Sequence, residues 1–112
     1  MARPRQRAEG SVPGALTAVG GGRFELSGDV GFADAARLLV EGDAAFRGEA
    51  AVEVDLARVA RVDSAGLALL LEWSLSARDA GRRIVYRNVP GSIASLAGMS
   101  DVAGLLEASA GG

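Results

Sequence analysis

The sequence contains no cysteine and no histidine. Without them the chain cannot form disulfides, thiol nucleophiles, imidazole acid–base pairs or zinc sites of the usual kind, and most hydrolase chemistry is excluded as well. Lysine is also absent, so the 12 basic residues are all arginine, and with 14 acidic residues they give a net charge of −2. Because a phosphate backbone attracts a basic surface, this balance predicts no nucleic-acid partner.

Long apolar runs are missing too. The longest strongly apolar run, Leu67–Leu71, is far shorter than the ~20 residues that cross a bilayer, and the basic start is not followed by the apolar core of a signal peptide. We therefore expect a cytoplasmic protein that meets a membrane only through a partner. Paired carboxylates at workable spacing, a Walker sequence and a metal-ligating cluster are not found either, so we expect no enzyme, no metal and no cofactor.

The chain does have enough apolar material for a core, because 49% of its 112 residues are hydrophobic. That content and length predict one compact domain, expected over residues 15–107. Residues 1–14 carry Arg3, Arg5 and Arg7 among prolines and glycines. We interpret them as a flexible basic tail, either a solvated leader or an anchor for membrane phosphates. Residues 108–112 are expected to form a second tail.

The strands follow from alternating apolar residues. Residues 15–19 and 23–27 flank Gly20–Gly22, which predicts a β-hairpin; a phosphate loop would need a helix after the glycines. Residues 52–56 alternate apolar with acidic residues, so they predict a strand with one buried face, continued by Val59 and Val62. Residues 84–86 predict a further strand.

Helices are expected between the strands, at residues 32–46 and 65–80, with a short third helix from Pro90 and a turn or short helix at 102–106. The fold class is therefore α/β, a mixed β-sheet of about four strands with helices packed on it. The core stripes expected for the first and third helices comprise Phe32, Ala35, Ala36, Leu39 and Ala45 or Phe46, and then Ile93, Leu96 and Ala97.

The second helix has apolar residues on two sides. The stripe expected to pack on the sheet comprises Leu67, Leu70, Leu71 and Leu75, with Ser74 between them. Leu69 and Trp73 lie four residues apart on another side. They either widen the core or form exposed apolar surface that a partner covers.

The most specific stretch runs from Val54 to Leu71, where a buried strand leads to Asp63 and Ser64 and a leucine-rich helix follows. We expect Ser64 to be the N-cap, with its oxygen accepting from a backbone N–H of the first turn. The positive helix N-terminus would also favour Asp63 or a phosphate on Ser64, and Gly66 lets another backbone or a partner come close. From this pattern alone, Ser64 is either only a cap or a functional hydroxyl.

The whole string resembles the STAS domain family, in which a strand is followed by Asp-Ser or Asp-Thr, a glycine and a leucine-rich helix. The specific match covers Val52–Leu71, with a weaker one at Leu26-Ser-Gly28. Within the family it looks most like the MlaB-type branch. That resemblance implies a non-catalytic cytoplasmic subunit, peripheral at the inner membrane, which binds and supports the ATPase of an ABC complex moving phospholipid between bacterial membranes.

Two departures from the family pattern leave a second interpretation open. The MlaB-type branch commonly has threonine where this chain has Ser64, and serine is what anti-sigma factor kinases phosphorylate in the antagonist branch. The chain would then be an anti-sigma factor antagonist switched at Ser64. Against this, Gly28-Asp29-Val30-Gly31 replaces the family's Gly-Glu-Leu-Asp, so the last carboxylate is missing.

In the family, the position that matches Ser64 is the regulated or partner-contacting one. We therefore expect the partner to contact the turn around Ser64, with Asp29 and Arg61 nearby in space. The full predicted set comprises Asp63, Ser64, Ala65, Gly66, Leu67, Asp29 and Arg61, extended by Leu69 and Trp73.

Overall fold

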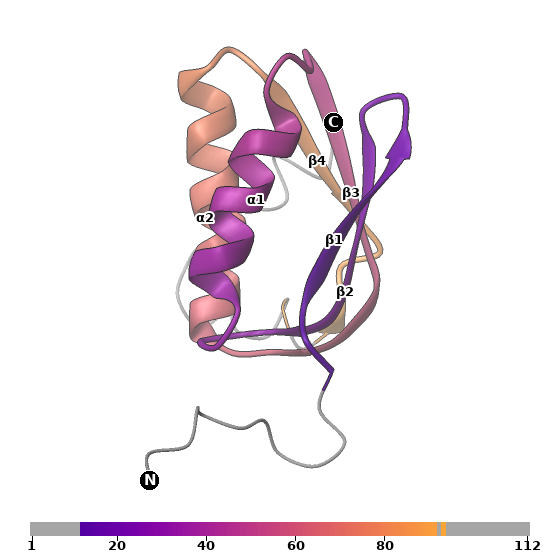
Figure 1. Cartoon of the computed structure of the whole chain (residues 1–112), viewed down its shortest axis with the longest axis vertical. Helices are drawn as coiled ribbons and strands as arrows, with labels where there is room; N and C mark the ends of the chain where they lie inside the picture. The colour runs from indigo at the N-terminus through magenta and orange to yellow at the C-terminus, as the bar shows by residue number, and fades with distance from the viewer. Residues whose placement is uncertain (1–11, 92, 94–112) are drawn as a thin grey trace, which may run out of the picture.

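The computed structural model describes residues 12–91 and residue 93. The elements follow one another as β1 (Ala15–Gly20), β2 (Arg23–Val30), α1 (Ala35–Phe46), β3 (Ala51–Val62), α2 (Ser64–Asp79) and β4 (Arg83–Arg87). The strands form one sheet in the order β1-β2-β3-β4. β1 pairs antiparallel with β2, whereas β2, β3 and β4 run parallel. Both helices cover the same face of this sheet (Figure 1), which confirms the predicted mixed four-stranded α/β architecture.

The hairpin forms where the glycines predict it. Gly20, Gly21 and Gly22 all have positive φ angles, of 97°, 65° and 78°, which side chains with a Cβ rarely adopt. The turn prediction is therefore confirmed. Beyond β4, the Ile93 amide donates to the Pro90 carbonyl oxygen at 3.1 Å; Leu96, Ala97 and the segments 102–106 and 108–112 lie outside the described residues.

The core lies between the sheet and the helices. Alternate residues of β2 and β3 point into it, as the alternating pattern of residues 52–56 predicts. An aromatic cluster joins the layers, because the Phe46 ring meets Phe24 and Trp73 edge-on at centroid distances of 5.0 and 5.2 Å. The strand residues in the core cluster comprise Phe24, Leu26, Val30, Val52, Val54, Leu56, Ile84 and Tyr86.

Helix α1 differs from its prediction in both start and face. It begins at Ala35 and buries Leu38, Gly42 and Phe46, so Phe32, Ala36 and Ala45 are exposed and Ala35 and Leu39 are half-buried. The reason is that alanines alone do not select a face, whereas Trp73 does. A Cβ at position 42 would overlap the Trp73 indole, so Gly42 must face α2.

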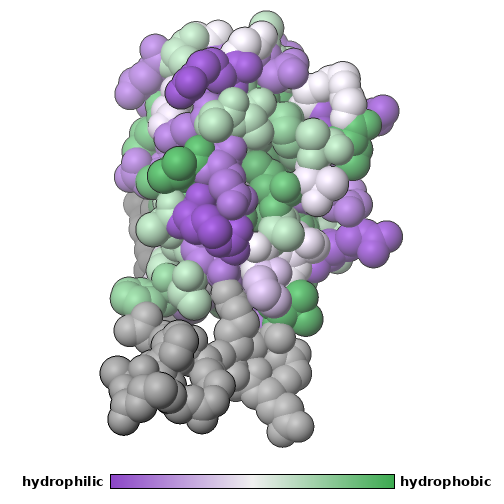
Figure 2. All heavy atoms as spheres, in the orientation of Figure 1, coloured by the Kyte–Doolittle hydropathy of each residue, from purple (hydrophilic) through white to green (hydrophobic). Residues whose placement is uncertain are grey.

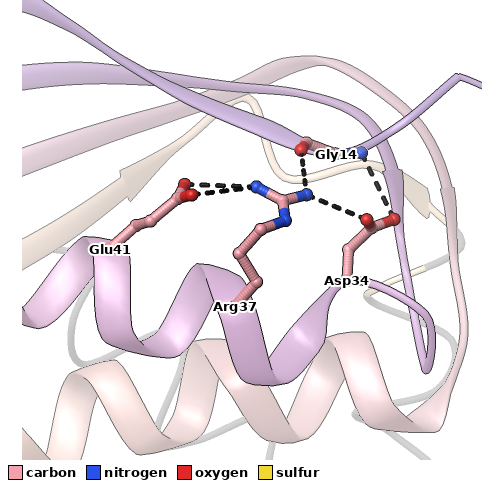
Figure 3. Close-up of polar contacts among 4 residues, drawn as sticks. All are labelled: Gly14, Asp34, Arg37 and Glu41. Carbon is pink, nitrogen blue, oxygen red and sulfur yellow. Dashed lines mark hydrogen bonds and ion pairs between the residues drawn. The ribbon is translucent and has the colours of Figure 1, made fainter.

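Residues 12–14 pack against β2 and α1. The Asp29 amide donates to the Val12 carbonyl oxygen at 2.8 Å. The Gly14 amide donates to Asp34 Oδ2 at 3.3 Å, and Arg37 Nη2 donates to the Gly14 carbonyl oxygen at 2.7 Å (Figure 3). Within the expected tail, Val12 and Gly14 are therefore hydrogen-bonded to β2 and to the start of α1.

Over the face in view, hydrophilic and hydrophobic residues are interspersed (Figure 2). Such mixing is ordinary for a solvent-facing surface. None of the helices in the described part of the chain has both the length and the hydropathy needed to cross a membrane.

Candidate functional site

The candidate site lies at one edge of the sheet. Because β2 and β3 are parallel, their carboxyl ends meet there, and the β2–α1 and β3–α2 connections run side by side (Figure 1). In α/β sheets this edge commonly forms the binding crevice. Here it holds a pocket of about 470 Å³. The residues lining it comprise Asp29, Val30, Gly31, Phe32, Ala33, Asp34, Arg61, Val62 and Asp63.

Asp63, and not Ser64, caps helix α2. Asp63 has extended backbone angles, φ −117° and ψ −172°, and its Oδ1 accepts a hydrogen bond from the Gly66 amide at 3.0 Å. Its Oδ2 accepts from the Phe32 amide at 3.1 Å. An N-cap residue needs a non-helical backbone, and Ser64 is already the first residue of the helix. The predicted Ser64 cap is therefore wrong by one residue.

Ser64 is exposed and directly follows Asp63, which lines the pocket. Since Asp63 provides the cap, the Ser64 hydroxyl is not needed for that purpose. The rest of the predicted turn is less accessible, because Ala65 is half-buried and Gly66 and Leu67 are buried. A Cβ at position 66 would overlap the Val30 carbonyl oxygen. The backbone that approaches Gly66 thus belongs to the chain itself.

Asp29 and Arg61 are brought together as expected. Their Cα atoms are partners in the parallel register of β2 and β3, and both residues line the pocket. Asp29 is half-buried and Arg61 is exposed. The pocket therefore offers an acidic and a basic side chain at the same edge as Ser64.

Leu69 and Trp73 belong to the core. Their exposed fractions are 3% and 1%, so they cannot extend a contact surface, and that part of the predicted partner site is wrong. The alternative of a wider core is confirmed, because both residues belong to the core cluster and Gly42 and Phe46 of α1 pack on Trp73. On the sheet side Leu67, Leu70 and Ser74 are buried as expected, whereas Leu75 is exposed.

At this site, the environment of Phe32 was predicted wrongly from the sequence. Its side chain is 77% exposed, although the helical pattern places it in the core. The Asp34 and Ala35 amides both donate to the Gly31 carbonyl oxygen, so residues 31–34 form a turn before α1. Asp34, a good N-cap type, was the sequence signal that could have placed Phe32 in a loop.

Acidic side chains also lie at this edge, but within residues 12–91 and 93 there is no group of three or more acidic residues that could hold a metal ion. The arrangement presents an exposed hydroxyl, an exposed aromatic ring and two opposite charges around a shallow pocket. Of these groups, aromatic and arginine side chains are enriched in protein interfaces.

A family model described as "Mlab, STAS domain" matches residues 17–107. The chain belongs to the MlaB-type STAS domain family. STAS domains are in general regulatory or accessory domains. A search of curated proteins gave no significant match.

Solved structures share the STAS fold. The anti-sigma factor antagonist SpoIIAA in its unphosphorylated form aligns with a TM-score of 0.59 at 16% identity, covering 74% of this chain and 79% of SpoIIAA. A sulfate transporter family protein from Wolinella succinogenes aligns with a TM-score of 0.64 at 20% identity, covering 82% of this chain and 75% of that one. A third structure, Mglu, aligns at 0.53 and 26% identity over 68% of this chain and 19% of its own length.

Proposed function

We propose that this STAS domain is an accessory subunit that binds and supports the ATPase of an ABC complex moving phospholipid between bacterial membranes. It works in the cytoplasm and reaches the inner membrane through that complex. The family match over residues 17–107 carries the proposal. The exposure of Ser64, which follows the pocket-lining Asp63 at the sheet edge, supports a contact there.

The contact is assigned to Asp29, Phe32, Arg61 and Ser64, which we call the docking surface. Phe32 supplies exposed aromatic area, and aromatic residues together with arginine dominate binding energy in many interfaces. Ser64 directly follows Asp63, whose carboxylate accepts a hydrogen bond from the Phe32 amide. This set replaces the part of the expected site that the fold buries.

Co-purification with the ATPase subunit from the same genome tests the proposal. Ser64→Arg places a long charged side chain on the docking surface and should abolish co-purification while leaving the circular dichroism spectrum unchanged. Val19→Arg is the matched control, because Val19 is 57% exposed beside the hairpin turn at the other end of the sheet (Figure 1). Wild-type chain that does not co-purify with the ATPase would refute the proposed function.

A second function, an anti-sigma factor antagonist switched at Ser64, is favoured by the exposure of that serine. A phosphate adds up to about two negative charges and can create or disrupt docking. Incubation with candidate kinases followed by mass spectrometry distinguishes the two functions. A mass gain of one phosphate that is lost in Ser64→Ala would favour the antagonist.

A further inference from the structure

Asp63 lies in the middle of the docking surface, yet its carboxylate is engaged within the chain. Oδ1 accepts from the Gly66 amide at 3.0 Å and Oδ2 accepts from the Phe32 amide at 3.1 Å. The first bond belongs to the start of α2 and the second to the β2–α1 turn. We call this pair of hydrogen bonds the Asp63 link.

Asp63 itself is exposed, and its carboxylate lies against the backbone of Gly31. A Cβ at position 31 would lie 2.7 Å from Asp63 Oδ2, so a side chain there would displace the carboxylate. Beyond Phe32 the turn is closed by the Asp34 and Ala35 amides, which donate to the Gly31 carbonyl oxygen at 3.0 and 2.8 Å. The backbone on both sides of Phe32 is therefore held, and Asp63 holds the Phe32 amide itself.

Phe32 has little else to orient it, because its side chain is 77% exposed. Ser64 follows Asp63 directly in the chain. We propose that Asp63 is a positioning residue, which does not contact the partner but holds Phe32 beside Ser64 so that the partner meets both at once. This inference rests on the proposed docking surface and adds that Asp63 fixes the position of Phe32 within it.

Asp63→Ser separates the two hydrogen bonds. Serine is as good an N-cap as aspartate, so the hydrogen bond from the Gly66 amide should persist. Because serine has one side-chain oxygen instead of two, the hydrogen bond from the Phe32 amide should be lost. Amide hydrogen exchange on the full chain should show about five- to tenfold faster exchange at Phe32, the factor expected for one net hydrogen bond, with Gly66 unchanged. Unchanged exchange at Phe32 would overturn the inference.

Affinity for the ATPase then tests whether Asp63 acts through Phe32. Phe32→Ala should weaken binding about tenfold or more, as for an aromatic anchor, and Asp63→Ser about fivefold. In the Phe32→Ala background, Asp63→Ser should have no further effect, because the residue it positions is gone. An equal loss in both backgrounds would show that Asp63 acts on the partner by itself and would contradict the inference.

The two measurements separate this inference from the proposed function. If the wild-type chain does not bind the ATPase, the proposed function fails, while the exchange rate of the Phe32 amide still decides whether Asp63 holds the turn. If the wild type binds but the two substitutions cause additive losses of affinity in the double variant, the proposed function stands and the positioning role of Asp63 is wrong.

Discussion

At the scale of single residues, the roles of Asp63, Ser64 and Phe32 depend on backbone angles and hydrogen bonds that the sequence pattern does not give. Asp63 and Ser64 are both good N-cap types, and only the extended backbone at Asp63 shows which of them caps α2. Phe32 has helical spacing to Ala35 and Ala36, but the turn that starts at Gly31 takes it out of the helix. Local patterns could therefore place the site near Ser64 without giving the role of each residue.

Gly66→Ala should destabilise the fold by about 1–3 kcal/mol, the usual cost of overpacking, because its Cβ would overlap the Val30 carbonyl oxygen and lie 2.7 Å from Val62 Cγ2. Urea unfolding followed by the fluorescence of Trp73, which is 1% exposed, measures the change. Gly91→Ala is the control, because a Cβ there meets nothing within 4 Å. Equal stability of the two variants would contradict the packing described for the start of α2.

At the scale of elements, the strands were predictable because their signals are local. A glycine turn and apolar alternation define β1, β2 and β3 within a few residues each. Helix faces were less predictable. α1 is rich in alanine and α2 carries leucines on several sides, so the buried faces depend on how the two helices pack through Gly42 and Trp73.

The attachment of α1 to Gly14, just before β1, depends on Arg37. It donates to Asp34 Oδ1 at 2.8 Å, to the Gly14 carbonyl oxygen at 2.7 Å and to Glu41 (Figure 3). Arg37→Met keeps the apolar stem and removes these bonds beside the buried Asp34, so it should cost about 1–3 kcal/mol in unfolding free energy. Arg47→Met is the control, because Arg47 is exposed at the end of α1. If Arg37→Met lowers the unfolding free energy no more than Arg47→Met does, the role of Arg37 in holding α1 is contradicted.

The end of β4 is linked to β3 in a pH-dependent way. Hydrogen bonds from the Asn88 side chain and the Ala57 amide lower the pKa of Asp55 from its ordinary 3.8. Because the folded-state pKa is lowered, the stabilisation is present above the ordinary pKa and is lost as the pH falls through the lowered value. Asp55 is largely solvated, so the contribution is about 0.5 kcal/mol or less.

Asn88→Gly removes the side-chain donor and keeps a residue that tolerates the positive φ of 55°. The difference in urea midpoint between wild type and this variant should therefore shrink as the pH falls from 7 through the lowered pKa of Asp55. A difference that grows on acidification would contradict the assigned direction of the pKa shift.

At the scale of the whole molecule, the four-stranded sheet could be predicted from strand signals spread between residues 15 and 86, and the family from the resemblance of one string, Val52–Leu71. The docking surface could be predicted only in part. It joins Phe32 and Asp29 from one connection with Arg61 and Ser64 from another, and that meeting depends on the parallel pairing of β2 with β3. The burial of Leu69 and Trp73 likewise needs the three-dimensional contact between the helices.

The most direct test of the account measures the affinity of the full chain for the ABC ATPase by titration. Wild type, Ser64→Arg and Val19→Arg are compared after circular dichroism has shown that all three have the same helical content. The account predicts that Ser64→Arg weakens binding by about a hundredfold or more, since a bulky charge at the centre of an interface removes hot-spot contacts, and that Val19→Arg binds like wild type. Wild-type affinity in Ser64→Arg would contradict the placement of the docking surface at the start of α2.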